Sequence, residues 1–490
     1  MSYKYIGVPK TISSKDCAEN GYVFAPSKYS RFIPNDNVLF VPLSQVCKES
    51  KTKTDVKRGE IYHYSEIGDI DVSTGTISST SLYGLHLPSE NPKSIQKNDI
   101  LVSTVRSYRG GFGLIDSSDD NMCCSPAILV IRSVDNKISK EYLLAFLRAD
   151  FTIEQILGRQ TRGMYPRLDG DAMDKLLIPI PKDKKIIRYI SDLMRAYLNK
   201  NELIKKRHAE ILRLIEEELQ NNQKPNTFEY HLPTLKNLKE VGRLDTGLYT
   251  EEYQRIVSPV HNYGNGFTTL RNLNYRALRG PNLAISVIGM THYSSIALSK
   301  KYYRLIQPMD VSEYGTLVSE RYFGNQNNIQ LLKQGDILFG AEGNIGKVHI
   351  LIDIAQKTVT NFHGMSITND TASLQEKCFV GCWMMWLKKK GYFDAYSVGG
   401  QGGSYGVEKT ENTIVPNFPD AKQKEIAALY HNPIEYNTGE FTLDNFTEKD
   451  NAYNAEAGIY ELDKTAKHLQ ELLNEAIDKI VNNQEVEIKF

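Results

Sequence analysis

The sequence predicts an α+β protein in which two mixed α/β domains are separated by a long antiparallel two-helix coiled coil with pseudo-two-fold symmetry. A strand–loop–strand pattern occurs twice, at Gln96–Ile115 and Lys333–Ile350, so that Asp336 lies 237 positions after Asp99. A polar, glycine-bearing loop followed by a strand that stops at proline also occurs twice, with the stops 238 positions apart at Pro181 and Pro419. A long helical segment follows each stop. Two patterns at nearly one offset indicate a duplicated unit.

The strand–loop–strand pattern predicts a β-hairpin. In its second copy the strand "DILF" turns through Gly343 and Gly346 into the strand "KVHILI". Glycine suits such turns because it adopts positive φ without a Cβ clash. The loop is not a phosphate-binding P-loop, because five residues instead of four separate Gly340 from Gly346 and Val348 stands where the magnesium-binding hydroxyl belongs.

The two helical segments carry heptad seams, which are typical of coiled coils. The first runs from about Asp183 to Gln220, and its seam positions are Ile190, Met194, Tyr197, Asn201, Ile204, His208, Ile211 and Ile215. The second runs from about Ala455 to Asn482, with seam positions Ile459, Leu462, Ala466, Leu469, Leu473, Ala476 and Ile480. Polar seam residues such as Asn201 and His208 often specify register and partner. We expect the two seams to pack against each other and to form the partner-binding region; the alternative is that each helix docks on its own domain.

These patterns divide the chain into four parts. A first domain spans residues 1–182, a central helix 183–224, and a second domain 225–419. Residues 420–490 are predicted to contain a short helix, "KQKEIAALY", then a polar insertion at 431–454 that the first half lacks, and finally the distal helix. The polar composition of the insertion predicts a loop.

Composition excludes several classes of protein. A hydrophobic content of 41% and a charged content of 24% are typical of a globular protein. The chain shows no apolar run of about 20 residues and no apolar signal core, so we expect a cytoplasmic protein without a membrane partner. The six cysteines form no CxxC pair and no zinc-finger spacing with histidine, which indicates reduced thiols and no metal. The formal net charge is zero, so any DNA binding must rest on locally segregated charge.

The chain resembles the specificity subunit of type I restriction-modification systems. The resemblance rests on "GDILFGAEGNIGKV" and its partner "NDILVSTVRSYRGGFG", on the "IPIP" and "VPNFP" stops, and on the two heptad helices. It implies two target-recognition domains that each read one half of a bipartite double-stranded DNA site, with the helices setting the spacing and docking two DNA methyltransferase subunits. It further implies that S-adenosylmethionine binds the methyltransferase, and ATP and magnesium a restriction (translocase) subunit, with no cofactor in this chain.

Most of the residues that could read DNA lie in the loops of the two repeated patterns, and Arg321 lies in the separate stretch "RYFGNQNNIQ". Arginine suits guanine, and glutamine or asparagine suits adenine. The candidates in the first half are Arg106, Tyr108, Arg109, Arg159, Gln160, Arg162, Tyr165 and Arg167; those in the second half are Arg321, Asn344, Lys347, Gln401, Ser404, Tyr405 and Lys409. The alternative is that these are solvated loops and turn formers. Glu342, within the glycine loop, could accept a hydrogen bond from cytosine N4 or cap the turn, and we expect the cap.

Three functional hypotheses follow. The leading one is a non-catalytic DNA-recognition subunit of a complex for DNA methylation and phage defence. The alternatives are a specificity-like subunit of another bacterial phage-defence system and a coiled-coil scaffold without DNA specificity. Intrinsic methyltransferase activity is disfavoured, because the (N/D)PP(Y/F) tetrapeptide is missing and Asn432-Pro433 is followed by Ile434. Salt-dependent duplex binding separates a DNA-reading subunit from a scaffold.

Overall fold

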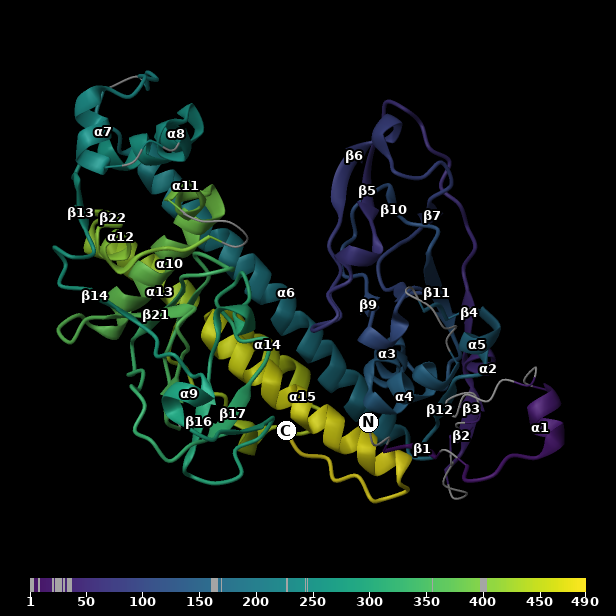
Figure 1. Cartoon of the computed structure of the whole chain (residues 1–490). Coiled ribbons are helices and arrows are strands. Elements are labelled where there is room, and N and C mark those ends of the chain that lie inside the picture. Colours follow the sequence, from purple (N-terminus) through teal and green to yellow (C-terminus); the bar gives the residue numbers. More distant parts are fainter. Residues whose placement is uncertain are drawn as a thin grey trace. The chain divides into compact units, whose positions relative to one another are not determined.

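The structure is a computed structural model of the whole chain, drawn in Figure 1. It describes residues 4–490 except 8, 20–21, 23–28, 30, 33–37, 160–165, 169, 226–227, 243, 245, 355 and 397–402. The chain forms two compact units. The first comprises Met1–Glu202, Tyr436–Asn454 and Lys464–Phe490, and the second Leu203–Glu435 and Ala455–Asp463. The division therefore falls inside each of the two long helices.

The two long helices are present where the heptad seams predicted them. Helix α6 spans Lys184–Asn221, 38 residues, and α15 spans Ile459–Val481, 23 residues. Every apolar seam side chain is buried, and the most exposed of them, Ile480, is only 6% exposed. The polar position His208 is 7% exposed, whereas Asn201 is half-buried. The three–four spacing of apolar residues in the sequence thus identified the buried face of each helix.

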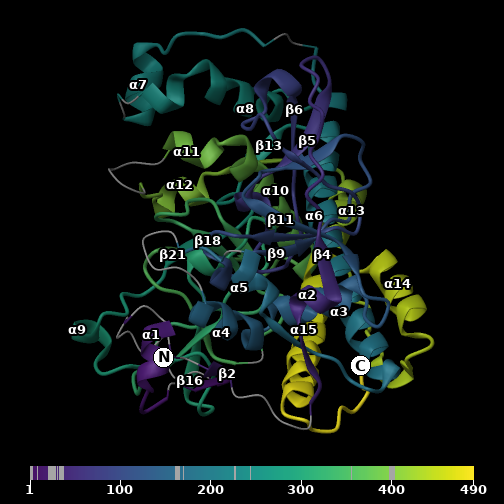
Figure 2. The ribbon, with the colours of Figure 1, turned by 90° about the vertical axis from the view of Figure 1, so that its right-hand side faces the viewer.

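Within the first unit, α6 and α15 run antiparallel. Tyr189, near the start of α6, donates its hydroxyl to the Lys489 carbonyl at 2.5 Å and packs edge-on against Phe490, just beyond the end of α15. Figure 2 shows the ribbon of α15 in yellow and marks the C-terminal end of the chain that follows it. Farther along α6, Lys200 bonds to Asn454, which precedes α15. The same apolar cluster contains Ile190 and Met194 of α6, side chains of α15 and the core of the first domain. The first half of α6 therefore packs both against α15 and against its own domain.

The described part of the first unit contains two four-stranded sheets. One has the order β6-β5-β10-β7, in which β5 and β10 are parallel, and the other has the order β4-β11-β8-β9 and is antiparallel. The strands are β4 Cys47–Glu49, β5 Ile61–Ser65, β6 Thr80–Tyr83, β7 Lys93–Ser94, β8 Ile100–Ser103, β9 Phe112–Leu114, β10 Met122–Cys124 and β11 Ile128–Val134. Short pairs join β1 Ile6–Gly7 to β2 Arg31–Phe32, and β3 Phe40–Pro42 to β12 Leu177–Pro179. The helices before α6 are α1 Ser14–Glu19, α2 Leu43–Val46, α3 Lys140–Arg148, α4 Asp150–Arg159 and α5 Gly170–Asp174.

The second unit repeats this plan. Its sheets have the orders β14-β21-β18-β19 and β15-β17-β16-β20, and β13 pairs with β22. The strands are β13 Phe267–Thr269, β14 Arg276–Arg279, β15 His292–Ser294, β16 Tyr302–Leu305, β17 Arg321–Gly324, β18 Ile337–Gly340, β19 Val348–Ile350, β20 Thr358–Val359, β21 Gly364–Thr368 and β22 Ile414–Pro416. The helices are α7 Leu235–Val241, α8 Glu251–His261, α9 Ile285–Ile288, α10 Leu374–Lys390, α11 Tyr392–Tyr396, α12 Val407–Glu411 and α13 Asp420–Tyr430.

Both predicted hairpins form, and the turns that lead into them match closely. Ile100 pairs with Leu114 in β8–β9, and Ile337 pairs with Ile350 in β18–β19. Each hairpin is preceded by a turn whose carboxylate accepts a backbone N–H three residues earlier, at 3.0 Å for Asp99 and 2.8 Å for Asp336. The residue before each carboxylate has positive φ, 65° at Asn98 and 81° at Gly335. The duplication therefore extends from sequence to backbone conformation.

Helix α10 shows how a local signal sets an element. Ser373 and Glu376 form a capping box at its start, and Gly391, with φ 85°, ends it. Cys378 and Cys382, four residues apart on this helix, are both buried. All six cysteines are free thiols. In the described residues, no helix combines the length and apolar character needed to cross a bilayer.

The prediction of a loop at 431–454 was wrong in part. Helix α14 spans Phe446–Glu456, and α13 ends at Tyr430, as the short predicted helix does. The buried positions of α14 are Phe446, Asp450 and Asn454, spaced four apart on one face. Two of these three are polar, so an apolar period could not reveal the helix.

Candidate nucleic-acid interface

In each half of the chain, the two repeated loops lie side by side. An isolated antiparallel bridge joins Val105 to Arg167 in the first half and Glu342 to Ser404 in the second. Both members of the second bridge lie 237 positions after those of the first. One backbone hydrogen bond is repeated as well. The Leu168 N–H donates to the Thr104 carbonyl at 3.0 Å, and the Tyr405 N–H donates to the Ala341 carbonyl at 2.8 Å. The fold thus brings the predicted DNA-reading segments together twice, in one register.

The first-half loop presents arginine beside tyrosine. Arg106 has a left-handed backbone, φ 51°, and donates its N–H to the Pro166 carbonyl at 2.8 Å, which ties the hairpin turn to the second loop. Arg109 is exposed and its guanidinium lies 6.0 Å from the Tyr108 ring, which itself packs against the core. Arg167 is exposed. The predicted contacts Gln160, Arg162 and Tyr165 lie outside the described residues, and so does the side chain of Arg159, at the end of α4.

The second-half loop presents different chemistry. Asn344 is exposed at the hairpin turn and Ser404 is half-buried, while Gln401 lies outside the described residues. The Glu342 carboxylate does not cap the turn. It pairs with Arg279 of β14 through one oxygen, and its other oxygen lies 2.8 Å from Nδ1 of His363.

Arg279 and His363 were missed by sequence reasoning. Arg279 also donates to the Tyr405 carbonyl at 3.2 Å and approaches the Ser404 hydroxyl at 3.5 Å, so it joins both loops. His363 and the neighbouring Phe362 are exposed beside it. No local motif marks these residues. Only the pairing of β14 with β21 and of β21 with β18 brings them to the loop.

Tyr405 does not contact solvent, and its prediction as a base-reading residue is corrected. Its side chain is 0% exposed and packs between Phe339 and Phe393, with ring centroids 5.6 and 5.3 Å away. The equivalent residue in the first half, 237 positions earlier, is Leu168, 1% exposed. Both side chains anchor the second loop in the core.

Three other predicted contacts are engaged inside the second unit. Arg321 pairs with the buried Asp310 at 2.9 Å. Lys347 donates to the Val311 carbonyl at 2.6 Å, and burial lowers the pKa of its ammonium. Lys409 is half-buried on α12. These positions favour structural roles, and a role in contacting DNA stays a prediction for each of them.

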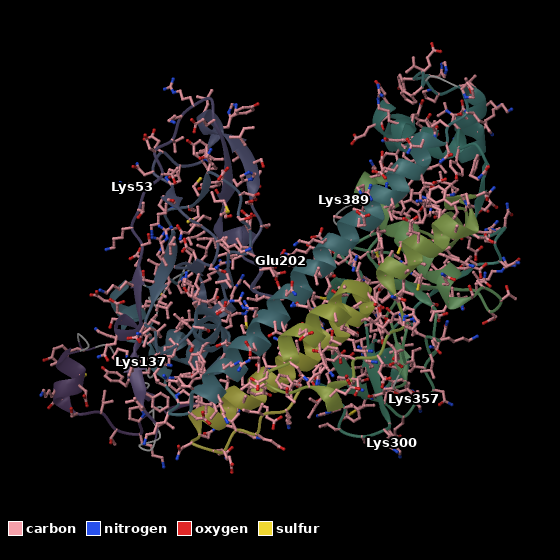
Figure 3. All side chains as sticks on the ribbon, turned by 180° about the vertical axis from the view of Figure 1, so that it is seen from behind. Lys53, Lys137, Glu202, Lys300, Lys357 and Lys389 are labelled. Atoms are coloured by element: carbon pink, nitrogen blue, oxygen red, sulfur yellow. The ribbon has the colours of Figure 1, made fainter. Side chains whose placement is uncertain are left out.

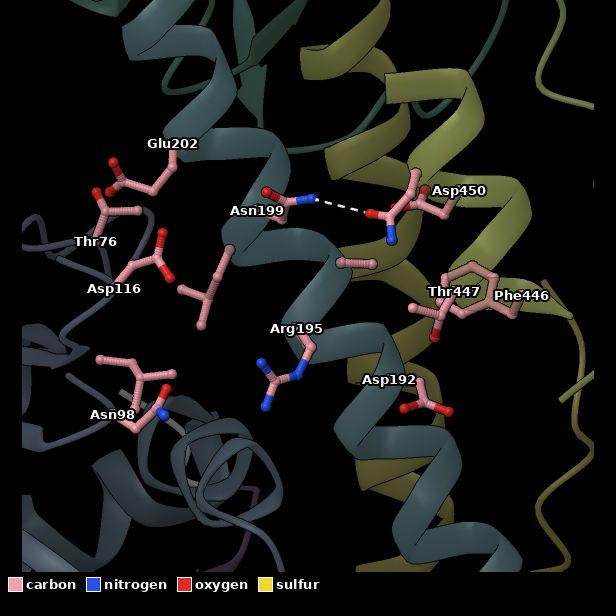
Figure 4. Close-up of a pocket in the computed structure, with 14 residues that line it drawn as sticks. Thr76, Asn98, Asp116, Asp192, Arg195, Asn199, Glu202, Phe446, Thr447 and Asp450 are labelled. Atoms are coloured by element: carbon pink, nitrogen blue, oxygen red, sulfur yellow. Dashed lines mark hydrogen bonds between the residues drawn. The ribbon is translucent and has the colours of Figure 1, made fainter. Parts of the chain in front are cut away.

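A groove in the first unit runs over α6, between the domain that contains the β8–β9 hairpin and helix α14 (Figure 4). Its cavity has a volume of about 240 Å³ and includes Asn98 and Asp116 on one side and Thr447 on the other. Asp192 and Glu202 of α6 add negative charge, and burial raises the pKa of Asp192. The seam side chains, by contrast, are covered within the chain. A role of the seam side chains in partner binding stays a prediction, and they are buried within this chain.

Part of the chain is similar in sequence to proteins of known function. Residues 35–213 match the family described as "Type I restriction modification DNA specificity domain". The specificity subunit of the type I restriction enzyme HindI from Haemophilus influenzae is 30% identical over 119 residues, which are 24% of this chain and 26% of that protein. Over residues 35–213 the chain is therefore similar to this domain family. The match to the HindI subunit spans about a quarter of that protein's length.

Two solved structures align over most of the chain at low identity and low TM-score. The alignment with the HsdS subunit from Thermoanaerobacter tengcongensis covers 93% of this chain and 99% of that subunit, with 17% identity and a TM-score of 0.33. The alignment with the type I restriction-modification S subunit from M. genitalium covers 91% of this chain and 97% of that subunit, with 12% identity and a TM-score of 0.34. The family match itself, residues 35–213, contains the first pair of loops and most of α6. The second pair of loops lies outside this match and is related to the first pair by the internal duplication.

Proposed function

We propose that this chain is a non-catalytic sequence-recognition subunit of a type I restriction-modification complex that reads a bipartite double-stranded DNA target. The observation that carries the proposal is the repeated register of the two loops in each half. One half presents Arg106 and Arg109 at this place, and the other presents Asn344 beside the Arg279–Glu342 pair. Two readers of common architecture and different chemistry suit a target whose two halves differ.

Affinity and specificity have different sources in this proposal. Lysine and arginine contacts with phosphates supply most of the affinity, and side chains that reach base edges supply the choice of sequence. The net charge of zero does not oppose this, because only the local field at the loops matters. Arg109 is the leading candidate for a base contact in the first half, and Asn344 in the second.

The partners and cofactors follow from the same proposal. Two DNA methyltransferase subunits dock along the long helices, and the outward face of α6 beside α14 is a surface open to them in the first unit. S-adenosylmethionine binds those subunits, and ATP and magnesium bind a restriction subunit where one joins the complex. The chain itself contributes recognition and spacing, and no catalytic step.

Exchange of one domain tests the assignment of two readers. The chain is expressed with its methyltransferase, and residues 1–182 are replaced by the first domain of another family member. We expect one half of the methylated site to change and the other to stay as it was. The matched control replaces 225–419 and changes the other half. A chimaeric chain that altered both halves, or neither, would refute the assignment.

Lengthening the helices tests their role as spacer. A heptad added to both α6 and α15 keeps the seam in phase. It lengthens each helix by roughly 10 Å, at 1.5 Å per residue. The expected result is a wider gap between unchanged half-sites. Seven residues inserted in the 431–445 segment instead leave both helices intact and serve as the control, with an unchanged gap. An unchanged gap after the double heptad insertion would contradict the spacer role.

Duplex binding at several salt concentrations separates DNA reading from scaffolding. A chain that neutralises about six phosphates loses roughly 10³ in affinity between 50 and 200 mM salt. A coiled-coil scaffold shows no duplex binding at any salt concentration. A specificity-like subunit of another defence system binds duplex but directs no methylation when paired with a type I methyltransferase.

A further inference from the structure

A second cavity lies inside the second unit, where α6 passes the β18–β19 loop and the end of α10. Its volume is about 200 Å³. Lys347 from the loop and Lys388 and Lys389 from α10 line it, together with His208 from α6. Figure 3 labels Lys389 beside α6. Met385 and Val348 supply an apolar wall. Three elements distant in sequence thus direct nitrogen-bearing side chains to one cavity.

Gly346 makes this convergence possible. Its φ is 84°, and a Cβ added there would lie 2.7 Å from Cδ of Lys388 and 2.6 Å from the Phe393 ring. Any other residue would push the Lys388 stem away from the loop. The glycine of the "GNIGK" stretch therefore does not build a P-loop, but it does allow the lysine that follows it and Lys388 to line one cavity.

His208 faces the cavity without a partner for its ring nitrogens in the described residues. The residue is 7% exposed and lines the cavity, and its ring packs edge-on against Tyr314 with centroids 5.3 Å apart. Buried polar groups in proteins are nearly always hydrogen-bonded. A cavity-facing imidazole with no protein partner is a donor available to a ligand.

Positive charge in the cavity is only partly balanced. Among the described residues, Glu313 is the only carboxylate that lines it, while Lys388 is 3.0 Å from Asp394 outside it. The pKa of His208 is lowered to about 4, chiefly by burial; the Glu313 charge raises it and the Lys389 charge lowers it. The pKa of Lys347 is lowered chiefly by burial; the Glu313 charge raises it and the Lys388 charge lowers it. The cations thus disfavour one another, and an anion among them would relieve this repulsion.

We propose that this cavity binds a phosphate group, supplied by the DNA backbone or by free phosphate. A phosphate offers several acceptor oxygens, which suits donors that come from α6, from the loop and from α10, and lysine is an established phosphate-binding side chain. The apolar wall of Met385 and Val348 leaves room for the group attached to the phosphate. The backbone source rests on the proposed DNA-binding function, whereas the free-phosphate source does not.

The test uses the full chain labelled with ¹⁵N-histidine. The His208 signal is assigned by its loss in His208→Gln and followed against pH with and without millimolar inorganic phosphate, at constant ionic strength. Phosphate is expected to raise the pKa of His208 by about one unit, because the imidazolium gains an anionic partner. Lys389→Gln, an exposed position, weakens phosphate binding tenfold or more. The matched control Lys424→Gln removes an exposed lysine of α13 and leaves phosphate binding as in the wild type.

A DNA duplex then distinguishes the source. If the backbone fills the cavity, duplex shifts the His208 signal, and Lys389→Gln reduces the slope of log K against log salt by about one. If free phosphate shifts the signal and bound duplex does not, the ligand is a soluble phosphate. If the chain binds phosphate in this cavity but binds no duplex at all, the phosphate site is supported and the proposed DNA-binding function is refuted. If neither ligand moves His208, the proposal is overturned.

Discussion

Lys200 connects α6 to the insertion that the first half lacks. Its side chain is 0% exposed. The ammonium lies 2.6 Å from the Asp450 carboxylate and donates to the Asn454 amide oxygen at 2.6 Å. The rings of Tyr436 and Tyr453 lie 4.7 and 5.0 Å from it, and the Tyr436 hydroxyl donates to Asp450 at 2.8 Å. We predict that Lys200→Met releases α14 from α6.

The size of the effect follows from what the substitution leaves behind. Removal of one partner from a buried ion pair costs about 3–5 kcal/mol, because the remaining charge is uncompensated. Two cation–π contacts add about 0.5–2 kcal/mol each where they are desolvated. In Lys200→Met, Asp450 keeps only its bonds to Tyr436 and Asn454. The expected loss is therefore about 4 kcal/mol or more, and Lys200→Met/Asp450→Asn should lose less than Lys200→Met alone, because no buried charge remains.

Hydrogen exchange of the α14 amides is the suitable assay, because a chain of two units does not unfold in a single two-state transition. Lys200→Met should speed exchange at 446–456 by about a thousandfold, the equivalent of roughly 4 kcal/mol. Lys206→Met, an exposed lysine on the same helix, is the control and should change exchange little. Wild-type protection of α14 in Lys200→Met, or a double variant no better than the single, would refute the reasoning.

Further predictions concern charge at three other places. The pKa of His208 is about 4 in the folded chain against 6.5 for an ordinary histidine, so the unfolded chain takes up the proton first. Stability should fall by about 3 kcal/mol as pH drops from 6.5 to 4, and thermal unfolding of His208→Leu should lack this fall. Asp99→Asn strands Arg132, its partner at 2.8 Å, and should cost about 3 kcal/mol or more in chemical denaturation. Burial raises the pKa of Asp336, so its ionisation destabilises the folded chain as pH rises above about 4. At neutral pH, Asp336→Asn should therefore lower the free energy of unfolding clearly less than Asp99→Asn does. Arg109→Ala should weaken binding to duplexes that carry the first half-site by about 1–3 kcal/mol and leave second-half discrimination unchanged; equal losses at both halves would contradict its placement.

The hairpins and the long helices could be predicted because their signals are local. The glycines at 343 and 346 have φ of 71° and 84°, as the turn requires. The seams are apolar at a three–four spacing, and burial follows that spacing. The α14 helix could not be found in this way, because two of its three buried positions, Asp450 and Asn454, are polar and are buried only in company with Lys200.

The candidate interface was predictable in its segments and less so in its side chains. The offset between the repeats identified both loops of each half, but which residues point outward depends on tertiary packing. Tyr405 looked like a surface aromatic in a glycine-rich loop. The same offset aligns it with Leu168, an apolar core residue, and that alignment was a signal available in the sequence. Arg279 and His363 reach the loop only through strand pairing, which no local pattern encodes.

Mapping of methylated bases across the genome of a host with and without this gene, alongside its methyltransferase, tests the central claim most directly. Two readers on one chain predict a single new methylated motif made of two short, different half-sites separated by a gap of fixed length. A continuous motif, or no motif that depends on the gene, would contradict the account.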